Sequence, residues 1–449
     1  MSDRRKVLEL FEKHKEYIDE RVRSGIELYR KGYAVVTVKD SNGNVIPDAR
    51  VKVNQKTHEF KYGSNLFMLD ELETEEKNRR YKEIMADFGN IATLPFYWDA
   101  TEPEKGKTRY DKDSVKVYRR PAIDRCMEFC EEHGIEPREH ALAYEAFFPK
   151  WLYGADVAEV KRELERRYKE ISERYAHMIN TIEVTNEMNW YGGKTAFYNQ
   201  SDYVEWCFKL AEKYFPANQL VVNEVTDLCW KDHCRCTDQY YSYIAANIAK
   251  GARIDAIGMQ YHQFNEREKE YEYTRTTYSP LKLFWHLDLY AQFGKPIQIT
   301  EVTIPSYSWE EEDEAIQAEI IENLYSIWFS HPAVEQIIYW NMIDGYAHLW
   351  NPDPVAIEKS QGDMTVGENY YHGGLLRFDM TPKPAFYTIK NLFEKKWHTE
   401  EERVTGATGE FKFHGFYGTY ELEIEVEGKT VKKEIKLSKN SRNIMEISI

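Results

Sequence analysis

Short apolar segments rich in β-branched residues alternate with amphipathic helical stretches along most of this 449-residue chain. Eight of these segments are candidate strands: 61–68, 90–98, 136–144, 179–187, 219–225, 254–262, 296–302 and 335–342. Eight strand–helix units in roughly 340 residues are typical of a (β/α)8 barrel. A doubly wound open sheet is the alternative, but no glycine-rich phosphate loop follows the first strand. We therefore predict an α/β fold built on a (β/α)8 TIM barrel.

The two ends of the chain carry a different pattern. Residues 3–31 are highly charged and place apolar residues at roughly helical spacing, which predicts one or two helices. Residues 33–53 alternate apolar and polar side chains around Asn42-Gly43, which predicts two strands joined by a β-hairpin or a tight turn. The C-terminal tail alternates in the same way, with a turn at Glu427-Gly428. The predicted units are a helix-plus-hairpin segment (1–60), the barrel (61–402) and an antiparallel β unit (403–449), with 33–53 and the tail expected to form one small accessory sandwich.

Composition excludes several classes of function. The net charge of −16 and a pI of about 5.4 argue against nucleic acid as a partner, because phosphate binding needs a basic surface. There is no apolar run of ~18 residues, so we expect no membrane-spanning helix. The charged N-terminus lacks the apolar core of a signal peptide, which predicts a cytoplasmic protein unless a leader has been removed. Six cysteines do not suggest a disulfide framework, and the oligomeric state is left open.

Two predicted strands end on a glutamate: Thr181–Glu187 ends on Glu187 and Pro296–Glu301 on Glu301. A carboxylate at a buried strand end costs free energy unless something pairs with it. The carboxyl ends of all barrel strands meet at one face, so both groups can serve one site. Glycoside hydrolysis needs two such groups, one protonated to help the leaving oxygen depart and one ionised. The other predicted strands also end in polar or aromatic residues: Trp98, His140, Tyr144, Asn186, Asn223, Glu224, Gln260, His262, Trp340 and Asp344.

Five segments together resemble the signature segments of family 10 glycoside hydrolases, the endo-β-1,4-xylanases. They are WDATEPEKG at 98–106, TNE at 185–187, IGMQYH at 257–262, ITE at 299–301 and GLLRFDMTPKPAFY at 374–387, and the likeness covers about residues 25–400. The resemblance implies a retaining double displacement on xylan or xylan-derived oligosaccharides. Glu187 matches the acid/base and Glu301 the nucleophile, and retention predicts carboxyl groups about 5–5.5 Å apart.

The resemblance also implies roles for the neighbouring residues. Asn186 matches the residue that bonds the sugar 2-hydroxyl. His262 and Gln260 match groups that hold the nucleophile and the sugar. His140 matches a histidine of the glycone site, and Trp340 matches a stacking platform. Trp98 and Tyr144 are further candidates for substrate binding, and retaining glycosidases need no cofactor and no metal.

Two segments depart from the family pattern. Thr93–Trp98 lacks the lysine and asparagine with which the family grips the glycone sugar. The run Ala143-Tyr144-Glu145 adds a third carboxylate, and we expect Glu145 to contact a sugar hydroxyl or form a salt bridge. The substrate is therefore left open among β-linked oligosaccharides, uronic-acid-bearing fragments and plant glycosides, with endo or exo action. A catalytically silent carbohydrate-binding protein is the non-enzymatic alternative.

One cluster falls outside this scheme: Cys229, His233, Cys234 and Cys236. Thiolates and imidazoles this close in sequence can hold zinc. The spacing is not that of a standard Cys-x2-Cys pair, so we expect reduced loop cysteines and no metal.

Overall fold

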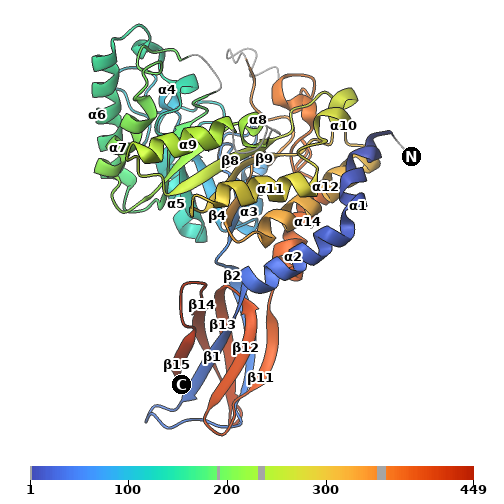
Figure 1. The fold of residues 1–449 in the computed structure, drawn as a ribbon. Helices are drawn as coiled ribbons and strands as arrows, with labels where there is room; N and C mark the ends of the chain where they lie inside the picture. The colour runs from blue at the N-terminus through green and yellow to red at the C-terminus, as the bar shows by residue number, and fades with distance from the viewer. Residues whose placement is uncertain (1–2, 190–192, 231–237, 351–360) are drawn as a thin grey trace.

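The computed structural model describes residues 3–189, 193–230, 238–350 and 361–449 (Figure 1). Its strands are β1 (Lys31–Lys39), β2 (Arg50–His58), β3 (Lys61–Asn65), β4 (Ile91–Pro95), β5 (Glu136–His140), β6 (Thr181–Asn186), β7 (Gln219–Glu224), β8 (Ala256–His262), β9 (Ile297–Thr303), β10 (Val334–Tyr339), β11 (Glu400–Val404), β12 (Glu410–Phe416), β13 (Gly418–Val426), β14 (Lys429–Leu437) and β15 (Ile444–Ser448).

The α-helices lie mostly between these strands. They are α1 (Glu9–Lys13), α2 (Lys15–Tyr29), α3 (Glu75–Asp87), α4 (Trp98–Thr101), α5 (Ile123–His133), α6 (Val157–Tyr175), α7 (Tyr203–Tyr214), α8 (Thr226–Cys229), α9 (Gln239–Ala249), α10 (Glu270–Tyr273), α11 (Pro280–Ala291), α12 (Glu311–Ser330) and α14 (Pro384–Asn391). Short 3-10 turns are η1 (Asp3–Leu8), η2 (Glu145–Phe147), η3 (Lys150–Leu152), η5 (Arg267–Lys269) and η6 (Gly367–Tyr371), and a π turn, η7 (Leu392–Lys396), follows α14.

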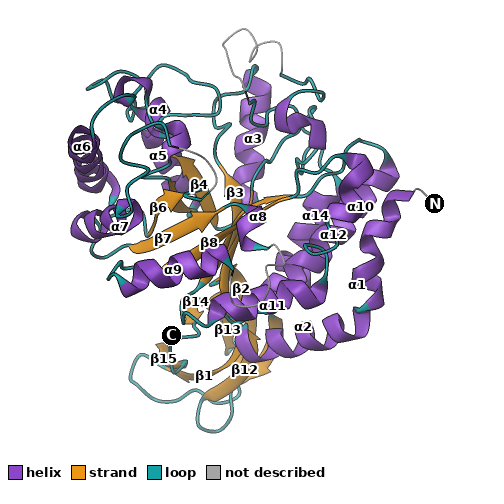
Figure 2. Ribbon diagram, turned by 45° about the horizontal axis from the view of Figure 1, so that its top comes forward, coloured by secondary structure: helices purple, strands orange, loops and turns teal. Residues whose placement is uncertain are grey.

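Eight parallel strands close into a barrel in the order β10-β3-β4-β5-β6-β7-β8-β9. Most residues of these strands are buried on both faces, because the lumen covers one face and the surrounding helices the other. Figure 2 shows the barrel strands surrounded by helices. The predicted (β/α)8 barrel is confirmed.

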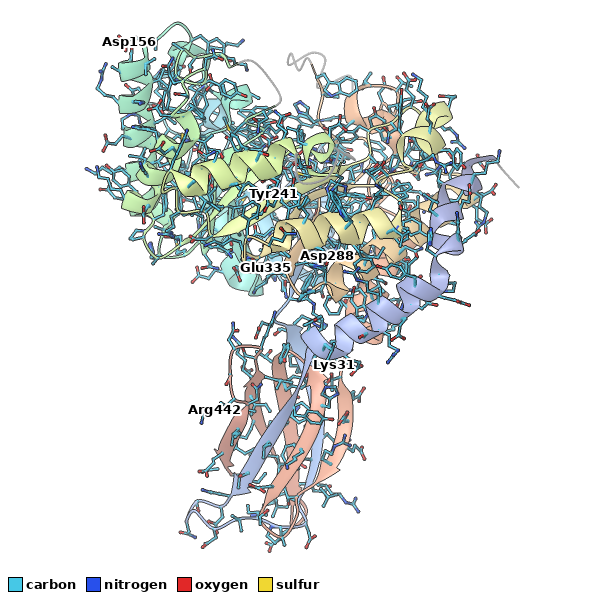
Figure 3. The ribbon with its side chains drawn as sticks, in the orientation of Figure 1. Lys31, Asp156, Tyr241, Asp288, Glu335 and Arg442 are labelled. Carbon is cyan, nitrogen blue, oxygen red and sulfur yellow. The ribbon has the colours of Figure 1, made fainter. Side chains whose placement is uncertain are left out.

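The remaining strands form a second lobe of two sheets, β12-β1-β15 and β11-β2-β13-β14 (Figure 1). Val36 and Val38 of one sheet and Val51 and Leu422 of the other share one apolar core. The accessory β unit built from both chain ends is therefore confirmed. Figure 3 shows that side chains fill this lobe separately from the barrel, with Lys31 near the junction of the two.

The tight turn predicted at Asn42-Gly43 is present and is closed by one antiparallel bridge between Lys39 and Val45, but β1 and β2 do not pair with each other as a hairpin. Gly43 has a φ of 84°, and the Asp40 carboxylate accepts the backbone N–H groups of Asn42 and Asn44 at 2.8 Å each. The strands on either side enter different sheets, because β1 pairs with β12 and β2 pairs with β13. Strands β12 and β13 from the C-terminal tail thus pair with the edges of β1 and β2 that would face each other in a hairpin. β11 also begins two residues before the predicted barrel boundary at 402.

The N-terminal helical segment packs on the barrel before the chain enters the second lobe. Buried Arg4 pairs with Glu270 at 2.8 Å and with Asp313 at 3.2 Å. Gly25 of α2 lies so close to the end of α12 that an added β-carbon would be 2.4 Å from the carbonyl oxygen of Ser330. In the described part of the chain, no helix combines the length and apolar character needed to cross a bilayer.

Candidate active site

The two strand-end glutamates come together at the carboxyl ends of β6 and β9. Glu187 directly follows β6 and has a φ of 55°, a left-handed conformation that is costly for a residue with a β-carbon. Glu301 is the fifth residue of β9 and is 3% exposed. Burial raises the pKa of Tyr144, and the charges of Glu187 and Glu301 both add to that rise, so both carboxylates act on one small region.

Glu187 is held by two side chains from other strands. Gln260 of β8 donates from Nε2 to Glu187 Oε1 at 3.0 Å, and the Tyr144 hydroxyl donates to the same carboxylate. Burial raises the pKa of Glu187 above its usual value, and these two donors only partly offset that effect. A carboxyl group that keeps its proton more firmly than usual is suited to donate it to a leaving group.

Glu301 has a hydrogen-bond donor on each oxygen. Asn223 Nδ2 donates to Oε1 at 3.0 Å, and His262 Nε2 lies 3.2 Å from Oε2. His262 Nδ1 lies 2.9 Å from the Thr303 hydroxyl, which donates to it when Nε2 carries the proton. Burial, with the charges of Glu183 and Glu187, raises the pKa of Glu301 to about 8, against the lowering effect of His140.

Asn223 ties the strand ends together beneath the glutamates. Its Nδ2 reaches Glu301 at 3.0 Å and Asn186 Oδ1 at 3.1 Å, and its Oδ1 accepts from the Thr300 hydroxyl at 2.7 Å. Gly258 on the neighbouring strand makes the room, because an added β-carbon there would be 2.5 Å from Asn223 Oδ1. The sequence marks Asn223 only as a strand-end polar residue, and its bridging role follows from the register of β6, β7 and β9.

A compensated charge network lies under the site. Glu183 of β6 is fully buried, pairs with the Arg138 guanidinium and accepts from His140 Nδ1 at 2.8 Å. His140 and Arg138 lower the pKa of Glu183 despite its burial. His140 Nε2 lies 2.9 Å from the Tyr97 hydroxyl, so protein side chains occupy both ring nitrogens. Sequence reasoning missed Glu183, Arg138 and Tyr97. The signal for Glu183 was its place four residues before Glu187.

Aromatic rings border the glutamates on the β3, β4 and β10 side. Trp340 packs edge-on against His140 at a centroid distance of 5.3 Å and against Phe67 at 5.1 Å. It also lies 6.0 Å from the ring of His262. Tyr97 completes the group at 5.7 Å from Phe67. Trp340 is thus brought to the site, beside both histidines.

Asn186 is brought to the centre of the site with a free donor. Its Oδ1 accepts from Asn223 and from Gln260, the latter at 3.3 Å. Its Nδ2 is buried and has no partner among the described residues.

Two predicted residues lie away from the glutamates. Trp98 opens α4, donates from Nε1 to Glu102 at 2.9 Å and packs against Phe148 and Trp151. Because the chain turns into α4 there, Tyr97 takes the place at the site. Glu145 is buried, and its Oε1 accepts the backbone N–H of Thr195 at 2.5 Å. Its other oxygen has no partner among the described residues.

Three potential metal ligands lie close together at the site. Ligand atoms of His140, Glu183 and Glu301 lie within 4.8 Å of one another. Arg138 and Asn223 already bond the two carboxylates, so a cation would have to compete with a guanidinium and an amide donor. His233, Cys234 and Cys236 lie outside the described residues. Cys229 is a buried thiol whose Sγ lies 3.2 Å from the carbonyl oxygen of Glu224.

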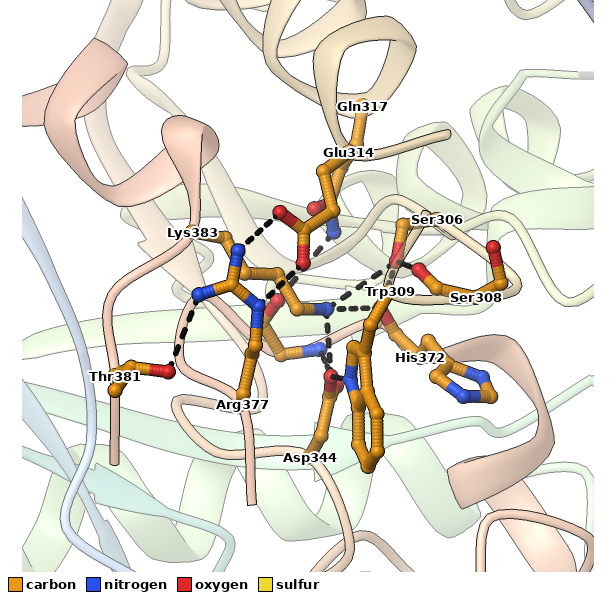
Figure 4. A network of polar contacts seen from close by, with 12 residues as sticks. Ser306, Ser308, Trp309, Glu314, Gln317, Asp344, His372, Arg377, Thr381 and Lys383 are labelled. Carbon is orange, nitrogen blue, oxygen red and sulfur yellow. Dashed lines mark hydrogen bonds and ion pairs between the residues drawn. The ribbon is translucent and has the colours of Figure 1, made fainter. Parts of the chain in front are cut away.

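Asp344, the remaining strand-end carboxylate, builds a structural clamp (Figure 4). It pairs with fully buried Lys383 at 2.6 Å and accepts from Trp309 Nε1 at 2.7 Å. Lys383 also donates to the His372 carbonyl at 2.7 Å. The clamp joins the segments that follow β9 and β10 to residues 372–383. Glu224, at the end of β7, also has a structural contact: its carboxylate accepts the backbone N–H of Asn189 at 2.8 Å.

A closed (β/α)8 barrel with two carboxyl groups and their amide, imidazole and aromatic neighbours at the carboxyl ends of the strands defines a glycosidase-type barrel. Comparison with known sequences is specific: the profile of Glycosyl hydrolase family 10 matches residues 57–392, and the chain belongs to this family.

Similar proteins include Endo-1,4-beta-xylanase B of Cellvibrio japonicus, 25% identical over 318 residues, covering 68% of this chain and 45% of that protein. Another is Anti-sigma-I factor RsgI6 of Acetivibrio thermocellus, 25% identical over 408 residues, covering 89% of this chain and 46% of that protein. The chain thus spans about half the length of these relatives. Among solved structures, native xylanase 10B from Thermotoga maritima has a TM-score of 0.57 at 23% identity, covering 75% of this chain and 96% of that one.

Proposed function

We propose that this protein hydrolyses β-linked, xylan-derived oligosaccharides with retention of anomeric configuration. The observation that carries the proposal is that two buried glutamates at the carboxyl ends of barrel strands act on one small region, each held by two side chains. The ionised form of Glu301 accepts from Asn223 on one oxygen and, when His262 Nε2 carries the proton, from His262 on the other. The raised pKa values of both groups mean that the pair retains a proton near neutral pH. We assign that proton to Glu187, because Glu187 matches the acid/base of family 10 glycoside hydrolases and Glu301 matches the nucleophile.

The reaction then proceeds in two displacements. Glu187 protonates the departing glycosidic oxygen while Glu301 attacks the anomeric carbon and forms a covalent glycosyl–enzyme ester. A water molecule, deprotonated by Glu187, then attacks the same carbon and releases Glu301. Gln260 and Tyr144 orient the acid/base, and His262 and Asn223 orient the nucleophile.

Binding of the sugar is proposed to use the remaining groups. The unpartnered Nδ2 of Asn186 supplies a buried donor for a sugar 2-hydroxyl. Trp340 offers an indole beside the glutamates for the C–H face of a pyranose. The xylanase relatives and the fold favour xylose as the sugar unit.

Xylotetraose hydrolysis followed by proton NMR tests the proposal. We expect the β-anomer of the new reducing end to appear first and the α-anomer to grow in by mutarotation. Initial formation of the α-anomer would rule out retention. Absence of turnover on xylo-oligosaccharides, aryl xylosides and other β-linked oligosaccharides would rule out the hydrolase. The initial product lengths separate endo from exo action.

A further inference from the structure

Two consecutive arginines lie beside the proposed sugar site without a carboxylate partner. Arg119 is 4% exposed and Arg120 is 8% exposed, in the irregular segment that precedes α5. Among the described residues, neither forms an ion pair. Arg119 donates to Asn341 Oδ1 at 3.1 Å and to the Tyr346 carbonyl at 2.5 Å, and its buried Nε has no partner. Within the described parts of the chain, the Arg120 side chain donates to the Arg119 carbonyl, at 2.9 Å.

The pair directly contacts the aromatic border of the site. The Arg120 guanidinium lies 3.7 Å from the Tyr97 ring centroid, and the Arg119 and Arg120 guanidinium groups lie 5.5 and 5.3 Å from the centroid of Phe67. Each arginine therefore contacts a ring that in turn touches a residue of the site, Tyr97 touching His140 and Phe67 touching Trp340.

Two carboxylates lie in this region, but among the described residues neither forms an ion pair with Arg119 or Arg120. Asp99 attracts Arg120 electrostatically, but it is exposed and forms no ion pair with it. Glu368 is reached only through Asn341, whose Nδ2 donates to it at 3.1 Å. The positive potential is felt nearby, since burial and then the two arginines lower the pKa of His348 to about 3.

The position of the pair is enforced by the fold. Arg119 has a φ of 59°, a left-handed conformation that is unfavourable for a residue with a β-carbon. Arg109 fastens the segment by donating to the carbonyls of Ala100 at 2.7 Å and Arg120 at 3.3 Å. Burying two like charges without a counterion is costly, so the fold sustains an unfavourable arrangement here.

We propose that Arg119 and Arg120 bind the carboxylate of a uronic acid on the glycone side of the substrate. The planar guanidinium matches a carboxylate with two parallel hydrogen bonds, and a bound carboxylate supplies the missing counter-charge. Arg120 contacts Tyr97 of the Thr93–Trp98 segment, in which the lysine and asparagine of the family pattern are absent. This inference rests on the proposed function in so far as the glutamates define where the sugar lies.

A matched substrate pair tests the inference. The probes are xylotriose bearing a glucuronic acid branch on its non-reducing xylose, and the same compound with the carboxyl group reduced to an alcohol. We expect the wild-type kcat/KM for the acidic compound to exceed that for the alcohol at least 10-fold. Arg120→Gln and Arg119→Gln should each lower this ratio at least 5-fold, and Arg120→Lys should keep part of it. Arg125→Gln, at an arginine that pairs with Asp70 at 3.5 Å, should leave the ratio unchanged.

Binding to the Glu301→Gln variant separates the two proposals. Calorimetry should show at least 10-fold tighter binding of the acidic compound, weakening as salt rises and lost with Arg120→Gln. If wild type hydrolyses both compounds equally and Glu301→Gln binds them equally, the inference fails while the hydrolase stands. If neither is hydrolysed but the acidic one binds preferentially through Arg120, the inference stands and the proposed hydrolysis fails. Equal weakening of both ligands by Arg120→Gln would make the arginine a mere structural support.

Discussion

The charged groups beneath the glutamates and the guanidinium groups of Arg119 and Arg120 are buried to a similar degree. The first set is paired with opposite charges, and the second is not. Glu183 is paired with Arg138 and His140, so each charge has an opposite neighbour. Among the residues that the structure describes, the two arginines contact carbonyls, an amide and aromatic faces but no carboxylate at ion-pair distance. A paired charge stabilises the native state once its partner is buried with it, whereas an unpaired one costs free energy that a ligand can recover. The first region supports the proposed reaction and the second marks a place for substrate.

The largest effect is expected at the nucleophile above the paired network. Glu301→Gln should lower kcat by at least about 10⁴-fold, because the amide cannot form the glycosyl ester. Steady-state hydrolysis of an aryl xyloside measures this loss. Glu335→Gln is a matched control at a half-buried glutamate that bonds Gln298 at 2.8 Å in β9, and should change kcat only a few-fold. Comparable losses in both variants would remove Glu301 from its proposed role.

The next largest effect is expected on the free energy of unfolding, which should respond differently to the loss of Arg138 and of Arg120. Arg138→Met leaves Glu183 without its guanidinium and should lower the free energy of unfolding by about 3–5 kcal/mol. Arg120→Met removes an unpaired charge and should lower it by less than about 1 kcal/mol, or raise it. Urea unfolding of both variants without ligand makes the comparison. Equal destabilisation would show that Arg120 is as well compensated as Arg138.

The pH dependence of stability should have opposite signs at Glu301 and Glu183. The pKa of Glu301 is raised to about 8 against an ordinary 4.5 and that of Glu187 is raised too, so between these values the native Glu187–Glu301 pair holds a proton that the unfolded chain has lost. Stability contributed by this pair therefore falls as pH rises through that window, at up to ~1.4 kcal/mol per pH unit. Glu183 has a lowered pKa, so its contribution is present above 4.5 and is lost as pH falls through its folded value.

Glu301→Gln removes the first effect and leaves the second. Its free energy of unfolding, relative to wild type, should rise between pH 5 and pH 8, as measured by urea unfolding at the two pH values. A constant difference would mean that the Glu187–Glu301 pair retains no extra proton in the folded protein.

The smallest effect is expected where the two regions meet. Tyr97→Phe removes the hydroxyl bonded to His140 but keeps the ring under Arg120. Losing one neutral hydrogen bond is worth about 1 kcal/mol, so kcat/KM should fall roughly 5-fold. Tyr387→Phe, at an exposed tyrosine of α14, should have no effect. A drop of several hundred-fold would place the Tyr97 hydroxyl in direct contact with the reacting sugar.

The sequence predicts the strand ends well because strand and helix periodicity are local signals. Glu187, Glu301, Asn186 and Gln260 were found in this way, and the structure brings them together. The sequence predicts a strand that continues to Trp98, whereas β4 ends at Pro95 and Trp98 is the first residue of α4. The Trp98 side chain therefore points away from the strand ends. β1 and β2 do not pair as a hairpin because their pairing partners come from the far end of the chain.

The sequence by itself determined the barrel, the accessory β unit and the two glutamates, since each depends on periodicity or on a residue that ends an apolar strand. Tertiary structure alone decided which groups surround those glutamates. Register shifts between Glu183 and Thr185 and between Met259 and Gln260 direct inward side chains that no local pattern specifies. Arg119 and Arg120 lie in a segment without regular structure, and only the folded chain brings them against Tyr97 and Phe67. Charge compensation is a property of distances between remote residues, and those distances exist only after folding.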